Sequence, residues 1–244
     1  MRSEYIIEIA TSDLETTRSA VEGGADRIEL CANLAEGGTT SSEGIIKKCR
    51  ESFHVQLYPI IRPRGGDFLY TRGEIETMMA DIRYCKQLGC DGIVTGFLTI
   101  DGRIDLKHTA VMVEQAYPMG VTFHRAFDRC LDPFEALEQL ISIGCERILT
   151  SGQMPTVDEG IEMLVKLNEA AGNRIIIMPG SGVRKENIKR LQERTGCYEF
   201  HSSLRQKKRS AMEFIHPCFA NSEESYSNNY IDPQEVRALR NALE

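Results

Sequence analysis

The chain has 244 residues, of which 41% are hydrophobic and 27% are charged, and its formal net charge is −7 with a sequence pI near 5.4. This length and composition are typical of one globular domain that needs no disulfide or metal for stability. The negative charge gives no general attraction to nucleic acid or anionic membranes, and no apolar run is long enough to span a bilayer.

The N-terminal residues and the cysteines both favour a cytoplasmic protein. The stretch from Met1 to Tyr5 passes directly into a strand-like run that contains Glu8, so it lacks the uninterrupted apolar segment of a signal peptide. The eight cysteines are scattered singly without a Cys-x-x-Cys pair, which disfavours a disulfide framework and a zinc site. We expect most of them to be small buried residues, with Cys31 as the exception.

Eight short apolar or β-branched runs alternate with amphipathic stretches along the chain. The runs begin near Tyr5, Arg27, Val55, Gly92, Val121, Arg147, Arg174 and Tyr198. Helices are predicted over 14–22, 42–50, 73–89, 106–117, 133–143, 157–170 and 185–194, with N-caps at Asp13, Asp105, Asp132 and Thr156. This alternation predicts parallel strands joined by crossover helices. Eight such units predict a single TIM-type (β/α)8 barrel domain over residues 1–244 rather than an open doubly wound sheet.

The segment from about 204 to 230 is polar and has little periodicity, so we expect an irregular loop there, followed by a final helix at about 232–243. Connections this long usually form lids, contacts or disordered segments. We expect this one to cover the pocket mouth or to pack against a neighbouring subunit. Its basic cluster at 205–209 is expected to be solvated surface rather than a nucleic-acid site.

Polar residues gather where the predicted strands end. Glu8 lies in the first strand; Glu29 and Cys31 share one phase of the second; Arg62 and Arg64 follow the third; His124 ends the fifth; and His201, Ser202 and Ser203 lie in and after the eighth. A barrel places its chemistry at this end of the strands. We therefore expect Glu8, Glu29, Arg62, His124 and His201 to face one pocket. The alternative is a set of structural ion pairs, such as Glu8 and Glu29 with Arg27 or Arg62, that fill the barrel.

The turn after the seventh predicted strand has a different character. Gly180, Ser181 and Gly182 form a turn before a predicted helix, so backbone N–H groups and the helix dipole would favour an anion there. Barrels often bind phosphate after strands seven and eight, next to which Ser202 and Ser203 would lie. We predict an anion site made of Arg62, Arg64, Gly180, Ser181, Gly182, Ser202 and Ser203. Glu8, Glu29 and His124 are the candidate acid–base groups.

Several motifs resemble the CutC family of copper homeostasis proteins. They are residues 25–32 (ADRIELCA), 59–68 (PIIRPRGGDF), 93–96 (IVTG), 122–128 (TFHRAFD), 149–153 (LTSGQ) and 201–203 (HSS), in order from about residue 5 to the final helix. The resemblance implies a cytoplasmic (β/α)8 barrel, commonly oligomeric, with a role in copper tolerance. The chain departs from the family pattern at Thr39-Thr40-Ser41-Ser42, where Leu-Thr-Pro-Ser is usual, and at Glu213, where an Arg is usual.

Three functions follow as alternatives. A copper protein would hold Cu(I) with soft ligands, and the candidates are Cys31, His124 and His201 if the barrel brings them together. A barrel enzyme would use the polar pocket for acid–base chemistry on a small phosphorylated or anionic substrate. A structural or regulatory barrel without catalysis is the third. The expected partners are a small anionic ligand or copper, and a second copy of the chain in a homo-oligomer, but neither nucleic acid nor membrane.

Overall fold

The computed structural model describes residues 5–221 and 226–243, and eight parallel strands form its centre. Each strand begins within two residues of its predicted position. The strands are β1 (Ile6–Thr11), β2 (Arg27–Leu30), β3 (Gln56–Pro59), β4 (Gly92–Thr95), β5 (Gly120–Phe123), β6 (Arg147–Thr150), β7 (Ile176–Pro179) and β8 (Glu199–Ser202).

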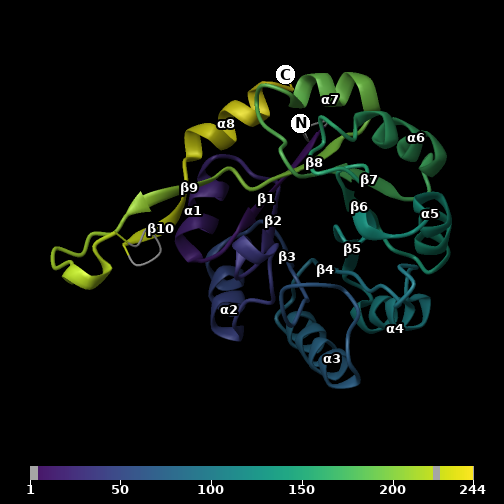
Figure 1. Cartoon of the computed structure of the whole chain (residues 1–244), viewed down its shortest axis with the longest axis horizontal. Helices are drawn as coiled ribbons and strands as arrows, with labels where there is room; N and C mark the ends of the chain where they lie inside the picture. The colour runs from purple at the N-terminus through teal and green to yellow at the C-terminus, as the bar shows by residue number, and fades with distance from the viewer. Residues whose placement is uncertain (1–4, 222–225, 244) are drawn as a thin grey trace.

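The strands follow one another in the ring order of a (β/α)8 barrel. Hydrogen bonds divide them into two four-stranded sheets, β3-β2-β1-β8 and β4-β5-β6-β7. At one junction Ile60 forms a parallel bridge to Val94, and the Ile61 amide donates to the Val94 carbonyl at 2.7 Å. At the other junction β7 and β8 pack side by side. Figure 1 shows the helices around this ring, and the parallel α/β barrel class predicted from the sequence is confirmed.

One helix follows each strand, except that β8 reaches its helix through an extra hairpin. The helices are α1 (Leu14–Glu22), α2 (Glu43–Ser52), α3 (Arg72–Gln87), α4 (Leu106–Ala116), α5 (Pro133–Ser142), α6 (Ile161–Ala171), α7 (Ile188–Thr195) and α8 (Pro233–Asn241). Short 3₁₀ turns lie at Leu34–Glu36, Phe127–Arg129 and Pro217–Phe219. No helix of the described residues is long and apolar enough to cross a membrane.

Three of the four predicted helix caps are confirmed. The carboxylates of Asp13, Asp105 and Asp132 accept hydrogen bonds from amides in the first turns of α1, α4 and α5. The fourth prediction is wrong, because the N-cap of α6 is Gly160 rather than Thr156. The Gly160 amide donates to the Thr156 carbonyl at 3.0 Å, so residues 156–160 close a turn of their own before the helix begins.

The apolar core lies between the strands and the helices, while the barrel interior is largely polar. On β1, Ile7 and Ile9 belong to the main hydrophobic cluster, whereas Glu8 between them is fully buried on the other face. Alternate residues of a strand point to opposite faces. The inward faces of β1, β2, β6 and β8 carry buried charged residues and the outward faces carry the main core, whereas Ala10, Cys31, Tyr58, Ile60 and Val94 form a separate apolar cluster.

The segment between β8 and α8 is an arm rather than an irregular loop. β9 (Arg205–Arg209) pairs antiparallel with β10 (Ser227–Ile231), with Arg209 opposite Ser227, and Figure 1 shows the arm projecting beside α1. The expectation of an unstructured segment over 204–230 is therefore wrong for both strands; residues 222–225 lie outside the described residues. All five residues of β9 are exposed and polar, so hydrophobic alternation gave no signal for this strand.

Candidate functional site

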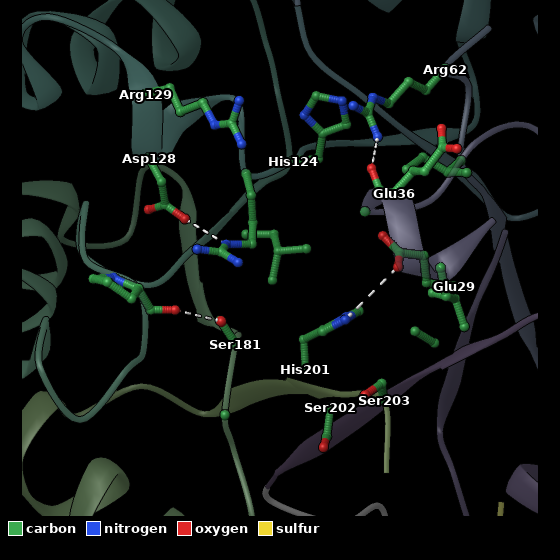
Figure 2. A pocket seen from close by; sticks show the side chains of 18 of the residues that line it. Glu29, Glu36, Arg62, His124, Asp128, Arg129, Ser181, His201, Ser202 and Ser203 are labelled. Carbon is green, nitrogen blue, oxygen red and sulfur yellow. Dashed lines mark hydrogen bonds and ion pairs between the residues drawn. The ribbon is translucent and has the colours of Figure 1, made fainter. Parts of the chain in front are cut away.

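A cavity of about 900 Å³ opens at the C-terminal ends of the strands. Its walls come from the strand ends and the loops that follow β2, β3, β5, β6, β7 and β8, and Figure 2 shows several of their side chains facing one another. The polar lining residues are Glu29, Glu36, Arg62, His124, Arg125, Asp128, Arg129, Gln153, Ser181, Arg184, His201, Ser202, Ser203 and Arg205. Four of the five residues expected to share one pocket line this cavity, and Glu8 lies directly beneath it.

Three side chains form the floor of the cavity. His201 Nδ1 lies 2.8 Å from Glu8 Oε1, and His201 Nε2 lies 3.8 Å from Glu29 Oε2. The second oxygen of Glu8 accepts from Arg27 Nη1 at 3.3 Å. Glu8 is therefore fully engaged, and its contact with Nδ1 fixes the orientation of the imidazole so that Nε2 faces Glu29.

The floor residues have pKa values that are displaced in opposite directions. Burial raises the pKa of Glu29 to about 7, with a smaller contribution from Glu8. Burial acts in the same direction on Glu8, but the hydrogen bond with His201 and the charge of Arg27 outweigh it and lower the pKa of Glu8 to about 2. Burial alone would lower the pKa of His201, yet the carboxylates of Glu29 and Glu8 raise it. At neutral pH an ionised Glu8 thus holds His201, whose pKa is raised, beside a Glu29 that is close to its own pKa.

His124 and Arg62 form one wall. The Ala126 amide donates to His124 Nδ1 at 3.2 Å, while His124 Nε2 has no hydrogen-bond partner among the described residues. Burial, with help from the charge of Arg62, lowers the pKa of His124 to about 3, so the ring is neutral at physiological pH. The ring of Phe68 lies 4.8 Å from that of His124 and beneath the guanidinium groups of Arg62 and Arg129.

Arg62 holds two loops together. Its Nη1 donates to the carbonyls of Glu36 and Gly38, and its Nη2 donates to the carbonyl of Gly66. Only Nε has no partner among the described residues. The side chain is buried, so Arg62 shapes the cavity through the loops after β2 and β3 and offers a ligand at most one further donor.

The loop after β7 contributes the other wall. The Gly180 amide donates to the Thr150 carbonyl at 3.0 Å, so it is not available to an anion, whereas Ser181 and Gly182 line the cavity and their amides make no hydrogen bond with described residues. Both have positive φ, +84° at Ser181 and +87° at Gly182. The predicted helix dipole is not at this loop, because α7 begins only at Ile188 after a turn at residues 185–187. Ser181 and Gly182 thus lie at the cavity and the Gly180 amide is already bonded, and anion binding at this loop stays a prediction.

Arg184 supplies positive charge next to this loop, where the sequence predicted the N-terminus of a helix. Its Nη1 donates to Ser202 Oγ at 3.0 Å, and Ser202 Oγ in turn donates to the Val183 carbonyl at 2.8 Å. Ser203 and Arg205 also line the cavity. Ser202 is thus a support for Arg184, while Ser203 is free to contact a ligand.

Arg64, predicted to bind an anion, does not line the cavity. Its Nε lies 2.6 Å from Glu74 Oε1 and its Nη2 lies 3.1 Å from Asp67 Oδ1, and the guanidinium stacks on the Tyr70 ring. Two carboxylates and a ring neutralise and hold this side chain at the start of α3. Arg62 and Arg64 are two positions apart, but the strand has already ended at Pro59, so strand alternation no longer decides where they point.

The predicted Cu(I) ligands are not brought together. Cys31 is fully buried, packs with Tyr58, Ile60 and Val94, and is not among the residues that line the cavity. Burial raises the pKa of its thiol well above the usual value, which disfavours the thiolate that binds copper. In the described part of the chain the only three His, Cys, Asp or Glu residues with ligand atoms within 4.8 Å of one another are Glu8, Glu29 and His201.

Sequence reasoning missed four arginines and Asp128. Asp128 accepts from the amides of Ser151 and Gln153 and pairs with Arg125 at 2.7 Å, so it organises the loop after β6. Arg125 and Asp128 lie in the segment after β5 that carries His124, so reading a few residues past His124 could have found them. Arg129, Arg184 and Arg205 lie in loops, where no periodicity marks them.

A second set of charged residues lies deeper, at the N-terminal ends of β2, β6 and β8. Glu199 Oε2 accepts from Arg27 Nη1 at 2.7 Å and from Arg147 Nε at 2.9 Å. The two guanidinium groups lie over the Tyr58 ring, 5.1 and 5.2 Å from its centroid, and Arg147 also pairs with Glu146. The structural ion pairs that the sequence offered as an alternative therefore exist, but they involve Arg27 with Glu8 and Glu199 rather than Glu29.

The fold and the cavity define a class: a (β/α)8 barrel with one polar, partly cationic pocket at the C-terminal ends of its strands. A model of the CutC family matches residues 5–206, and the chain belongs to this family. It is 46% identical to a family protein CutC of Chromobacterium violaceum over 99% of both chains. It is 44% identical to the human copper homeostasis protein cutC homolog, over 96% of this chain and 88% of that one. A crystal structure of the CutC protein from Streptococcus agalactiae superposes with a TM-score of 0.78 at 34% identity, covering 81% of this chain and 97% of that one.

Proposed function

We propose that this protein acts in copper homeostasis in the cytoplasm, and that it does so by binding a small anionic molecule in the cavity of the barrel. The human relative, which matches 96% of this chain, is named a copper homeostasis protein cutC homolog, and this supports the first part. One observation carries the second part: five arginines but only three carboxylates line the cavity of a chain whose net charge is −7. A cleft of opposite sign to the rest of the molecule concentrates and orients an anion.

The residues present do not fit a Cu(I) centre. Cu(I) prefers thiolate and thioether ligands, whereas the one closely spaced ligand group contains two carboxylates and an imidazole, and Glu8 in that group is already bonded to His201 and Arg27. The link to copper that we propose therefore runs through the small ligand. Direct binding of Cu(I) by Cys31, His124 and His201 stays a prediction.

Titration of one ¹⁵N-labelled sample with inorganic phosphate and then with Cu(I) tests this function. Millimolar phosphate should shift the amides of residues 181–184, and Arg184→Met should weaken the binding about 10-fold because a charge-assisted hydrogen bond is lost. Cu(I) should bind the wild type and Cys31→Ser equally. Unmoved amides in phosphate would contradict the anion site, and tight Cu(I) binding lost only in Cys31→Ser would restore the thiolate site.

A second candidate is an enzyme that acts on a small anionic substrate by acid–base chemistry. The contact between His201 Nε2 and Glu29, supported from behind by Glu8, favours it. A carboxyl with a pKa near the operating pH is suited to take up and return a proton in each cycle. Oligomerisation is a further proposal and concerns the arm: three large apolar side chains near its tip, Met212, Phe214 and Phe219, are more than half exposed.

A further inference from the structure

We infer that the cavity catalyses proton transfer at a carbon next to a carbonyl group, on a small hydroxy-carbonyl substrate that carries a phosphate at its far end. In this reaction Glu29 is the base, His124 is the neutral donor to the carbonyl oxygen, and Arg184 with the amides of Ser181 and Gly182 holds the phosphate. The inference rests on the acid–base function proposed above and names its substrate class and its residues.

Glu29 is placed as a base should be. Its side chain is 93% buried, lies on the cavity floor, and makes no hydrogen bond with described residues. Among the described residues its one ion-pair partner is His201, at a distance that is too long for a hydrogen bond, and the Glu8 carboxyl is a second charged neighbour. A buried carboxyl that the fold leaves without a donor is costly unless a ligand or a proton satisfies it. The other carboxylates of the interior do not share this property, since Glu8 and Glu199 each accept at least two bonds.

His201 influences the pKa of Glu29 without forming a hydrogen bond to it. Its Nδ1 is held by Glu8 at 2.8 Å, and the imidazole, when protonated, favours the ionised form of Glu29 across the 3.8 Å gap. Burial acts in the opposite direction, and the balance leaves the carboxyl able to gain and lose a proton near neutral pH. Glu8 is therefore a positioning residue, because it acts on Glu29 only through the imidazole.

His124 provides a hydrogen-bond donor without an acceptor in the wall of the cavity. Because the Ala126 amide donates to Nδ1, the ring proton must reside on Nε2, and this buried N–H has no partner among the described residues. The ring is fixed by the Phe68 ring at 4.8 Å and by Gly96, where a Cβ atom would come within 2.5 Å of it. Arg62 Nε is a second buried donor without a partner on the same wall. Figure 2 shows His124 beside Arg62, with Glu29 of the cavity floor below them in the view. Two buried donors without partners in the wall of a cavity call for a ligand with an acceptor oxygen.

The anionic end of the substrate is assigned to the loops after β7 and β8. The amides of Ser181 and Gly182 make no hydrogen bond with described residues, and Ser181 is held at φ +84°, a conformation that a serine adopts at a cost. The Arg184 guanidinium is fixed by Ser202 and by the Val183 carbonyl, and Ser203 lies next to it. Planar donors of this kind suit a phosphate. A substrate held here would extend across the cavity toward Glu29.

The chemical step needs no cofactor and no other reactant. The Glu29 carboxylate removes a proton from the carbon next to the carbonyl, so that the C–H bond breaks and an O–H bond forms on Glu29. The electron pair moves onto the carbonyl oxygen, and the resulting enolate is stabilised by the His124 Nε2–H, which donates without losing its proton. The proton of the neighbouring hydroxyl group then passes to the enolate oxygen, and Glu29 returns its proton to the former carbonyl carbon, so that a new carbonyl forms on the neighbouring carbon and the isomerisation is complete.

Solvent deuterium exchange tests the step without knowledge of the natural substrate. The full chain is incubated in D₂O with aldose and ketose phosphates of three to six carbons, and loss of the proton next to the carbonyl is followed by ¹H NMR. We expect exchange with at least one of them. Glu29→Gln should slow it at least about 100-fold, and His124→Phe about 100-fold, whereas His124→Gln, which retains a donor, should recover part of the rate. Arg184→Met should raise KM about 10-fold and leave kcat nearly unchanged.

The controls separate this inference from the proposed function. Cys218→Ser, which changes an exposed residue of the arm, is prepared in the same way and should exchange at the wild-type rate. If phosphate shifts the amides of residues 181–184 but no sugar phosphate exchanges, the inference is wrong and the binding function stands. If phosphate does not bind either, both are wrong. Exchange that is unaffected in Glu29→Gln, or that is abolished by a chelator and restored by a divalent metal, would also overturn the assignment of Glu29 as the base.

Discussion

The barrel interior contains two sets of ionisable residues. The side chains of the deeper set all have ion-pair or hydrogen-bond partners, whereas some of those in the cavity have none among the described residues. In the deeper set, every charge of Arg27, Arg147 and Glu199 meets an opposite charge or a hydrogen-bond partner. In the cavity, Glu29 lacks a hydrogen bond and His124 Nε2 lacks any partner among the described residues. Burial alone does not separate the two sets, because all five of these residues are at most 6% exposed.

The difference shows which buried charges serve the fold and which serve a ligand. A buried polar group that is fully paired stabilises the arrangement around it, whereas one that is left unpaired lowers stability until something binds. The deeper ion network therefore acts as the packing of the lower barrel. The cavity residues hold unsatisfied hydrogen-bonding capacity at the end of the barrel where catalytic residues of this fold are found.

Removing a member of the deeper network should have the largest effect on stability. Glu199→Ala leaves Arg27 and Arg147 buried 2.7 and 2.9 Å from an empty position, so we expect the free energy of unfolding to fall by about 3–5 kcal/mol. Urea denaturation followed by circular dichroism measures it. Glu146→Gln is the matched control, because the Glu146 side chain is 40% exposed, and its cost should stay below about 1 kcal/mol. Equal losses in the two variants would show that the network is not the stabilising set.

The second effect concerns pH and His124. The pKa of His124 is about 3 in the folded protein against 6.5 in the unfolded chain, so the unfolded state takes up the proton first as the pH falls. The contribution of this residue to stability is fully present above pH 6.5 and is lost toward pH 3, at up to about 1.4 kcal/mol per pH unit.

The measurement compares variants, because Glu29 titrates in the opposite sense over part of the same range. The stability of His124→Asn relative to wild type should improve by about 3 kcal/mol between pH 7 and pH 4. His54→Asn makes the same chemical change at an exposed position and should leave the pH dependence as it is. A His124→Asn curve parallel to the wild type would mean that the pKa of this ring is the same in the folded and the unfolded protein.

Glu29→Gln should stabilise the protein while it abolishes proton transfer. The pKa of Glu29 is raised from 4.5 to about 7, so the folded state keeps the proton that the unfolded state releases. The cost of ionising this buried carboxyl grows as the pH rises from 4.5 to about 7, so the glutamine should add about 3 kcal/mol at pH 8 and almost nothing at pH 4. Thermal unfolding at the two pH values measures the difference. Glu36→Gln, on the exposed rim of the cavity, should change stability by less than about 0.5 kcal/mol. A destabilised Glu29→Gln would place this residue with the paired set.

The sequence predicted the barrel and the end at which its polar residues meet, because both follow from periodicity and strand order. Inward alternation on β1, β2 and β8 placed Glu8, Glu29 and His201 correctly. It could not separate Glu29 from Arg27, which share a phase of one strand, because the distinction depends on partners from β1 and β8. Pairing across a barrel is a property of the closed arrangement of strands, and no local pattern encodes it.

The sequence-based predictions of side-chain position were wrong at the ends of strands and in the loops that follow them. Arg64 turned out to pair with Glu74 and Asp67, and Cys31 lies beneath Gly38 outside the cavity. In loops the direction of a side chain depends on turn geometry and on neighbours distant in sequence, as the late start of α7 also shows. The arginines that make the cavity cationic were missed for the same reason.

The arm allows the smallest effect on stability to be predicted, and it tests whether the two interior sets account for the fold without it. β9 is exposed along its whole length, and a two-stranded hairpin adds little stability of its own. Since Arg209 lies opposite Ser227, residues 210–226 can be replaced by Asn-Gly, which closes a tight turn while Leu204, Arg205 and Ile231 are kept. The free energy of unfolding measured at low protein concentration should then change by less than about 0.5 kcal/mol.

The same deletion removes Met212, Phe214 and Phe219, and if these apolar side chains are covered by a second copy of the chain, analytical ultracentrifugation should show the oligomer of the full chain converted to monomer. An oligomer that survives the deletion would contradict the role of the arm tip, whereas a barrel that unfolds without it would show that the arm, and not only the interior ion network, holds β8 and α8 in place.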